Sequence, residues 1–224
     1  MEPKDPSQDG ASSQWISGIA IPEGNLACGA RETAEILLPD VLNLHAQRVF
    51  VFAALAAQQK ALVVDAELLY VAAMFMNVGL TGAYAFSQRR YELDSASAAR
   101  QFLVSHRVAD ATVLEVWYAV ALHTTSEIPD HASPLAASLA AGVRTDLFGD
   151  KAANLSRESK AEILKELPRG KQFKERFIEA ISHGVAHRPA STFGTVSADV
   201  LERADPDYRR LNYCGLILGA KWKD

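Results

Sequence analysis

Three polar side chains interrupt the apolar stripes of this 224-residue chain: His45, His123 and Asp146. Because the ordinary pKa of histidine lies near neutral pH, His45 and His123 are candidates for a general acid and a general base. Two imidazoles and a carboxylate also form a ligand set for a divalent transition metal. A lone histidine on such a stripe is more often a hydrogen-bonded core residue, and Asp146 could equally cap the turn DLFG. Spacing alone does not show that the three side chains meet.

Overall composition excludes several classes of protein. A net charge of -4 at pH 7 argues against a nucleic-acid-binding protein, which carries a basic surface. The two cysteines, Cys28 and Cys214, indicate reduced thiols in a reducing compartment. We find no apolar signal segment at the N-terminus and no apolar run long enough to span a bilayer. We therefore expect a cytoplasmic protein with no nucleic-acid or membrane partner, and a homo-oligomer stays open.

Hydrophobic periodicity predicts that helices position these residues. We expect an all-α, single-domain bundle of about eight helices over residues 15–224, after a disordered leader over residues 1–14. WISGIAIPEG reads as a short ordered segment, and Asp65 and Asp94 as helix N-caps. The predicted helices cover residues 38–59, 65–77, 95–106, 109–123, 134–143, 156–167, 171–187 and 198–203.

Six segments resemble, in order, HD-domain proteins of the cyanamide hydratase-like group: NLHAQRVFVF, AAMFMNVGLT, RRYELDSASAARQFL, VALHTT, AAGVRTDLFG and RPASTFGTV. The resemblance covers about residues 19–201. It implies an all-α bundle whose metal is held by a first-helix His, a His-Asp pair and a later Asp. His45 matches the first His and Asp146 the final Asp, but Met76-Asn77 replaces the central pair. His123 resembles a further His found near the site in many such proteins.

The replacement at Met76-Asn77 changes the expected chemistry. A thioether and a neutral amide are poor substitutes for an imidazole and a carboxylate as ligands of a zinc, manganese or iron ion. A metal-activated water is then hard to sustain, so we expect no metal and no other cofactor. We expect Met76, Asn77, Tyr84, Arg89 and Glu92 to contact a small-molecule substrate, although Arg89 to Glu92 could simply form a solvated loop.

Three functions remain open from the sequence. The first is a metal-independent enzyme that acts on a small organic molecule by acid-base chemistry, as a lyase, an isomerase or a cyclisation catalyst. The second is a metal-dependent hydratase or hydrolase whose ligands are His45, His123 and Asp146. The third is a non-catalytic binding or regulatory protein. In each case we expect His45, Asn77, His123 and Asp146 to converge on one enclosed pocket, because isolated buried polar groups are costly.

Overall fold

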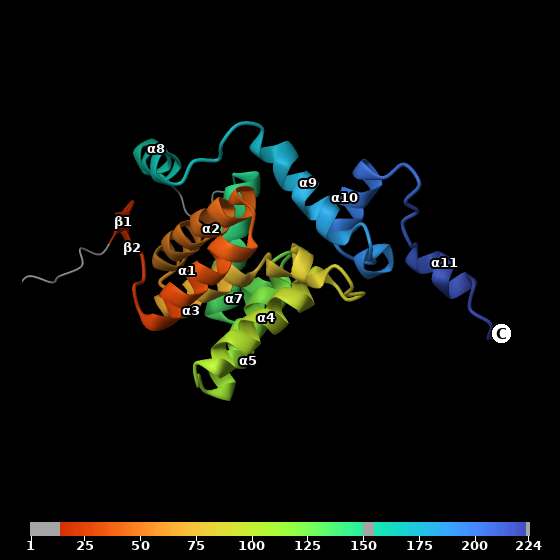
Figure 1. Ribbon diagram of the computed structural model, residues 1–224, viewed down its shortest axis with the longest axis horizontal. Coiled ribbons are helices and arrows are strands. Elements are labelled where there is room, and N and C mark those ends of the chain that lie inside the picture. Colours follow the sequence, from red (N-terminus) through yellow and green to blue (C-terminus); the bar gives the residue numbers. More distant parts are fainter. Residues whose placement is uncertain (1–13, 150–154, 223–224) are drawn as a thin grey trace, which may run out of the picture.

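The structure is a computed structural model that describes residues 14–149 and 155–222. The predicted leader, residues 1–14, lies outside the described residues except for Gln14, whose carbonyl accepts a hydrogen bond from the backbone N–H of Ile21. The described chain forms an all-α bundle with one small antiparallel hairpin (Figure 1). The predicted fold class, a single-domain helical bundle, is confirmed.

The described residues contain more helices than the eight that the sequence predicts; the additional ones are α1, α6 and α11. The eleven α-helices are α1 (Asn25–Leu37), α2 (Asp40–Gln59), α3 (Ala66–Phe75), α4 (Tyr91–Ser105), α5 (Asp110–Leu122), α6 (Ile128–Ala132), α7 (Pro134–Phe148), α8 (Arg157–Glu166), α9 (Phe173–Val185), α10 (Ser197–Ala204) and α11 (Tyr213–Leu218). Short 3-10 helices are η1 (Val78–Leu80), η2 (Gly82–Tyr84) and η4 (Pro189–Thr192).

The expected ordered segment before the bundle begins with a two-stranded hairpin, β1 (Trp15–Ile16) and β2 (Ile19–Ala20). Ser17 and Gly18 form its turn with φ of 51° and 79°, the sign that a tight hairpin turn requires. Ile16 pairs with Ile19, and both side chains are buried in the core. The hairpin therefore contributes core residues as well as leading into α1.

Helices α2 and α7 form the most extensive helix pair of the bundle. Gly142 of α7 permits their close approach, because a Cβ at this position would lie 2.4 Å from the backbone oxygen of Val49. Both helices are buried along most of their length. The pair carries His45 on α2 and Asp146 on α7, so the most extensive helix contact of the described chain also determines where these two side chains lie.

Three aspartates were considered as cap residues, and the structure confirms this role for Asp65 but not for Asp94 or Asp146. Asp65 caps α3 as expected, since its Oδ1 accepts a hydrogen bond of 3.0 Å from the N–H of Leu68. Asp94 is not a cap: α4 starts earlier, at Tyr91, and the Asp94 carboxylate is buried in ion pairs. Helix α7 continues past Val143, so Asp146 lies within the helix and the alternative of a turn cap is wrong. Gly149 ends α7 in the left-handed conformation, with φ of 72°.

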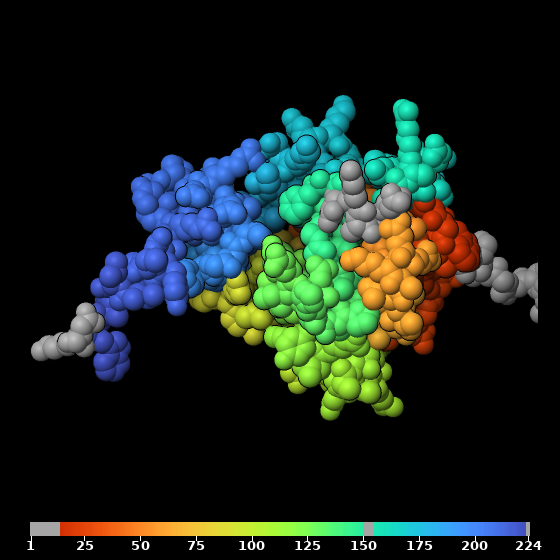
Figure 2. Space-filling view, turned by 180° about the vertical axis from the view of Figure 1, so that it is seen from behind, coloured from red at the N-terminus to blue at the C-terminus, as the bar shows by residue number. Residues whose placement is uncertain are grey.

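The C-terminal part of the chain lies against one side of the bundle. Helix α9 packs against α2 and η1, and α10 packs against α9. Helix α11 extends away from the rest of the chain, and all of its residues are exposed (Figures 1 and 2). Within residues 14–149 and 155–222, no helix combines the length and the apolar character needed to cross a lipid bilayer.

Replacing Gly142 with alanine tests the packing of α2 on α7. In an open helix this change adds about 1 kcal/mol of stability. Here we expect the clash with Val49 to reverse the sign and to lower the free energy of unfolding by about 1–3 kcal/mol in urea denaturation. Gly82→Ala is the control, because its Cβ would meet no atom within 4 Å. A stabilised Gly142→Ala variant would show that the two helices are not in close contact.

Candidate functional site

His45 and Asp146 form a buried pair between α2 and α7. The distance from Nδ1 of His45 to Oδ2 of Asp146 is 2.6 Å, and both side chains are almost fully buried. An ionised carboxylate can only accept hydrogen bonds, so the proton of the neutral imidazole must lie on Nδ1. No hydrogen bond joins Nε2 of His45 to another described residue. This arrangement leaves the Nε2 lone pair as the free basic position.

Two arginines complete the surroundings of Asp146, and the sequence analysis missed both. Nε of Arg48 lies 2.8 Å from Oδ1, and its second terminal nitrogen lies 3.1 Å from Oδ2, a bidentate pair. Arg169 donates to the backbone oxygen of Asp146 and, at 3.0 Å, to Oδ1. Arg48 follows His45 by three residues on α2, so the sequence alone could have placed the two side chains on the same face of the helix. Arg169 lies in the irregular segment between α8 and α9, where no periodicity identifies it.

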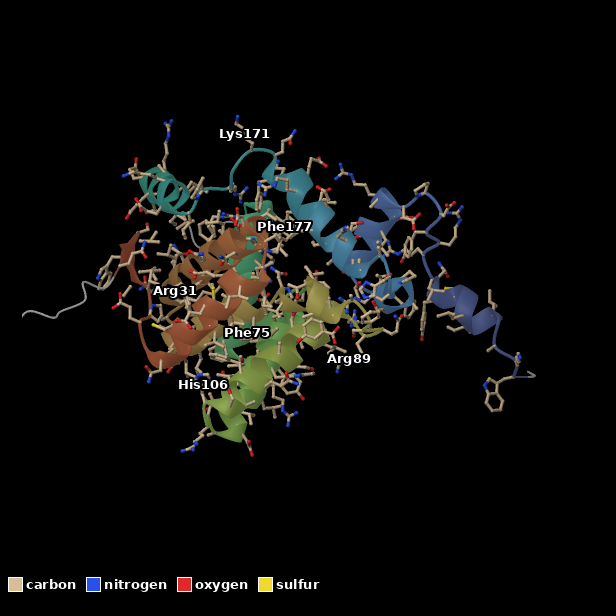
Figure 3. The ribbon with its side chains drawn as sticks, viewed as in Figure 1. Arg31, Phe75, Arg89, His106, Lys171 and Phe177 are labelled. Atoms are coloured by element: carbon tan, nitrogen blue, oxygen red, sulfur yellow. The ribbon has the colours of Figure 1, made fainter. Side chains whose placement is uncertain are left out.

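Aromatic rings of α9 cover the pair. The ring of Phe177 meets the His45 ring edge to face, with centroids 4.7 Å apart. Phe173 packs against both guanidinium groups, 4.8 Å from Arg48 and 4.9 Å from Arg169. Figure 3 shows Phe177 on the side of α9 that faces the bundle. These rings exclude water, which strengthens every charge interaction beneath them.

Burial and charge fix the protonation of this group. Burial alone would raise the pKa of Asp146, but the hydrogen bonds from His45 and Arg48, together with the positive charge of Arg48, hold that pKa at about 2. Burial lowers the pKa of His45, and the charges of Arg48 and Arg169 lower it further, against the opposing effect of Asp146. At neutral pH the group therefore consists of a carboxylate, two guanidinium ions and a neutral imidazole.

His123, the second predicted acid-base residue, belongs to a separate hydrogen-bonded group at the end of α5. Its Nδ1 donates to the carbonyl of Val120 at 2.7 Å, so Nε2 carries the lone pair. The hydroxyl of Tyr91 lies 3.4 Å from that Nε2. Burial lowers the pKa of His123 and raises the pKa of Tyr91 well above its ordinary value. His45 is near enough to influence the pKa of His123 as well.

The predicted substrate contacts fall into different environments. Glu92 is buried and accepts a hydrogen bond of 2.8 Å from Oγ1 of Thr124, the residue after His123. Arg89 instead forms an ion pair with Asp94, and Tyr84 is only partly buried. The idea that residues 89–92 form a solvated loop is wrong for Tyr91 and Glu92, because both lie buried in α4.

Met76 and Asn77 occupy the turn that follows α3, and both are buried. The Nδ2 of Asn77 donates to no other described residue, so this buried amide has an unused donor. No hydrogen bond connects it with His45, His123 or Asp146 in the described chain. The cavities on the described chain include five of about 230–520 Å³, and Met76, Asn77, His45 and His123 line none of these five. Convergence of His45, Asn77, His123 and Asp146 on one pocket stays a prediction; only His45 and Asp146 are shown in contact.

The residues present do not fit the metal that the HD-domain resemblance implies. Both oxygens of Asp146 already accept hydrogen bonds from guanidinium groups, and two such cations nearby would repel a divalent ion. Met76 and Asn77 provide neither an imidazole nor a carboxylate. Among the residues that the structure describes, no three His, Cys, Asp or Glu side chains are grouped so that they could hold an ion.

Comparison with known proteins adds no relative. The chain matches no protein family, and no curated protein shows significant sequence similarity to it. The resemblance to HD-domain proteins is therefore a prediction from the sequence motifs.

Asp146→Asn tests the buried charge group. The variant leaves two guanidinium ions with no carboxylate, so we expect the free energy of unfolding at pH 7 to fall by about 3–5 kcal/mol. Because folding lowers the Asp146 pKa to about 2 from roughly 3.9, its contribution is present above pH 4 and is lost as the pH falls toward 2. The difference between variant and wild type should therefore shrink over that range in urea denaturation.

Asp130→Asn is the matched control for this experiment. Asp130 pairs with Arg144 at 3.1 Å on the partly exposed surface, so its replacement should cost less than about 1 kcal/mol. Equal effects of the two substitutions would contradict the assignment of Asp146 as the central charge of the site.

Proposed function

We propose that this protein is a metal-independent enzyme that transfers protons on a small organic molecule, as a lyase, an isomerase or a cyclisation catalyst. The observation that carries the proposal is the Asp146–His45 pair, whose 2.6 Å hydrogen bond fixes the imidazole tautomer. A carboxylate behind Nδ1 stabilises the imidazolium that forms when Nε2 takes a proton. His45 is thus arranged as a general base.

His123 and Tyr91 are the proposed second acid-base group. The raised pKa of Tyr91 keeps its hydroxyl protonated at neutral pH, so it can donate to Nε2 of His123. In the proposed reaction, His45 removes a proton from carbon, and the proton returns to another atom of the same molecule or to a leaving group. Tyr91 donates its proton to the oxygen or nitrogen on which negative charge develops, and it takes a proton back from that atom when His45 returns its own. The unused Nδ2 donor of Asn77 is available to an acceptor atom of the substrate.

The HD-type relationship belongs to the same proposal. The order of six sequence motifs and the all-α fold support descent from a metal-dependent ancestor. In this account the frame of the ancestral site persists, while the metal ligands have been replaced. Arg48 and Arg169 then supply the positive charge that surrounds Asp146.

A non-catalytic binding protein is the second candidate function, and one observation favours it. His45 is 1% exposed, so no ligand reaches the His45–Asp146 pair in this structure. In a non-catalytic protein, the role of the pair would be to hold α2 against α7. The two candidates differ in one respect: a catalyst must expose Nε2 of His45 to a ligand during its cycle, and a structural pair need not.

Proton exchange in D₂O distinguishes the two candidates even while the substrate is unidentified. We expect the protein to catalyse deuterium incorporation into at least one carbonyl compound of a diverse metabolite mixture, detected by mass spectrometry. His45→Gln should reduce the rate by about 100-fold or more, and His123→Gln should also reduce it. A chelator should leave the rate unchanged. Exchange that survives both substitutions, or that requires a metal, would refute the proposed mechanism.

A further inference from the structure

A polar hollow lies on the surface of the bundle, next to the segment that follows α5. It has a volume of about 520 Å³ and lies between the start of α4, the loop after α5 and the C-terminal segment. Figure 2 shows the C-terminal region, in blue, next to the yellow segment that leads into α4. The side chains that give the hollow its polar character are Arg90, Thr124, Thr125, Ser126, Thr195 and Arg210.

Thr124 links the hollow to the proposed second acid-base group. Thr124 follows His123 directly, and its hydroxyl donates to the buried carboxylate of Glu92. Glu92 in turn influences the pKa of His123, so the three groups lie close together. A molecule in the hollow would therefore contact Thr124, which follows His123 in the chain and donates to Glu92.

The lining is suited to an oxyanion. It contains two guanidinium groups and one carboxylate, that of Asp199, although the chain as a whole carries a net charge of -4. One terminal nitrogen of Arg90 donates to the carbonyl of Gly194 at 3.2 Å. Arg210 pairs with Asp199 at 2.7 Å and, from the same nitrogen, with Glu202 at 3.9 Å. These contacts hold each arginine in place while leaving other N–H donors of the guanidinium groups available. The neighbouring hydroxyl groups add further donors.

An apolar surface continues from the same hollow. A second hollow of about 420 Å³ shares Gly194 and Arg210 with the first and is lined by Phe193, Leu211 and Tyr213. All three of these large side chains are exposed. A ligand that filled both hollows would combine a negatively charged group with an apolar body.

We propose that these two hollows bind the substrate as a small organic oxyanion, a carboxylate or a phosphate, with its apolar body against Phe193, Leu211 and Tyr213. Arg90 and Arg210 hold the oxyanion, and the hydroxyl groups of Thr124 to Ser126 orient it. The assignment of this ligand as the substrate rests on the proposed function. Binding of the oxyanion itself does not, because it requires only the surface groups.

Isothermal titration calorimetry with three probes tests the proposal on the full chain. The probes are 3-phenylpropanoate, 2-phenylethyl phosphate and the neutral 3-phenylpropan-1-ol. We expect the anions to bind at one site and the alcohol to bind at least about tenfold more weakly. The tighter of the two anions identifies the kind of oxyanion. Equal affinity for the alcohol, or no binding of either anion, would overturn the proposal.

Variants of the arginines locate the binding site. Arg90→Gln and Arg210→Gln should each weaken anion binding by about tenfold and leave alcohol binding unchanged, and Arg90→Lys should weaken it less. Thr125→Val should weaken anion binding while leaving the charges of Arg90 and Arg210 in place. Arg209→Gln is the matched control, since Arg209 is the neighbouring arginine and does not line either hollow. Circular dichroism establishes that each variant is folded, and unchanged anion affinity in Arg90→Gln would place the site elsewhere.

His45→Gln separates this proposal from the proposed function. We expect this variant to retain anion affinity and to lose proton exchange. If the anions do not bind while exchange depends on His45, the oxyanion site is wrong and the proposed function stands. If Arg90→Gln weakens anion binding while wild type and His45→Gln exchange protons at the same rate, the oxyanion site stands and the proposed mechanism is wrong.

Discussion

The carboxylate of Asp146 accepts hydrogen bonds from His45, Arg48 and Arg169, and through them it joins α2, α7 and the segment before α9. A buried carboxylate is costly unless it is paired, so the surrounding helices must bring these donors to it. Two guanidinium groups already exceed its charge by one. Burial is the main cause of the lowered pKa of His45, and the charges of Arg48 and Arg169 lower it further, so the imidazole is neutral. The same excess of positive charge disfavours a divalent ion.

Helix α9 covers His45 and is held at both ends by buried charge. At its start, Phe173 packs against the two arginines that bind Asp146. Beyond its end, Arg188 pairs with Asp94 of α4 and donates to the carbonyls of Gly79 and Gly184. Phe177 lies between these two sets of contacts, so both ends of α9 help to position the ring that covers His45. The polar hollow lies elsewhere on the bundle, where Thr124 and Thr125 follow the end of α5.

Local signals in the sequence predicted most of the helices. They did not predict ion pairs between residues that lie far apart in the chain. Asp65 was identified as a cap because the cap and its partner are three residues apart. Asp94 was misread by the same logic, since its partner Arg188 lies 94 residues away. The apolar stripes placed His45 and Asp146 inside the bundle, and the resemblance to HD-domain proteins placed them together. Arg169 gave no signal, because an irregular segment has no period that shows which way a side chain points.

The protonation state of His45 tests the central claim most directly. In ¹⁵N NMR spectra of labelled protein, with the resonance assigned through His45→Gln, the two ring nitrogens report both charge and tautomer. The account predicts a neutral imidazole at pH 7 with the proton on Nδ1, and a pKa below the ordinary value of about 6.5. An imidazolium at pH 7, or a neutral ring with its proton on Nε2, would contradict the assignment of His45 as a general base.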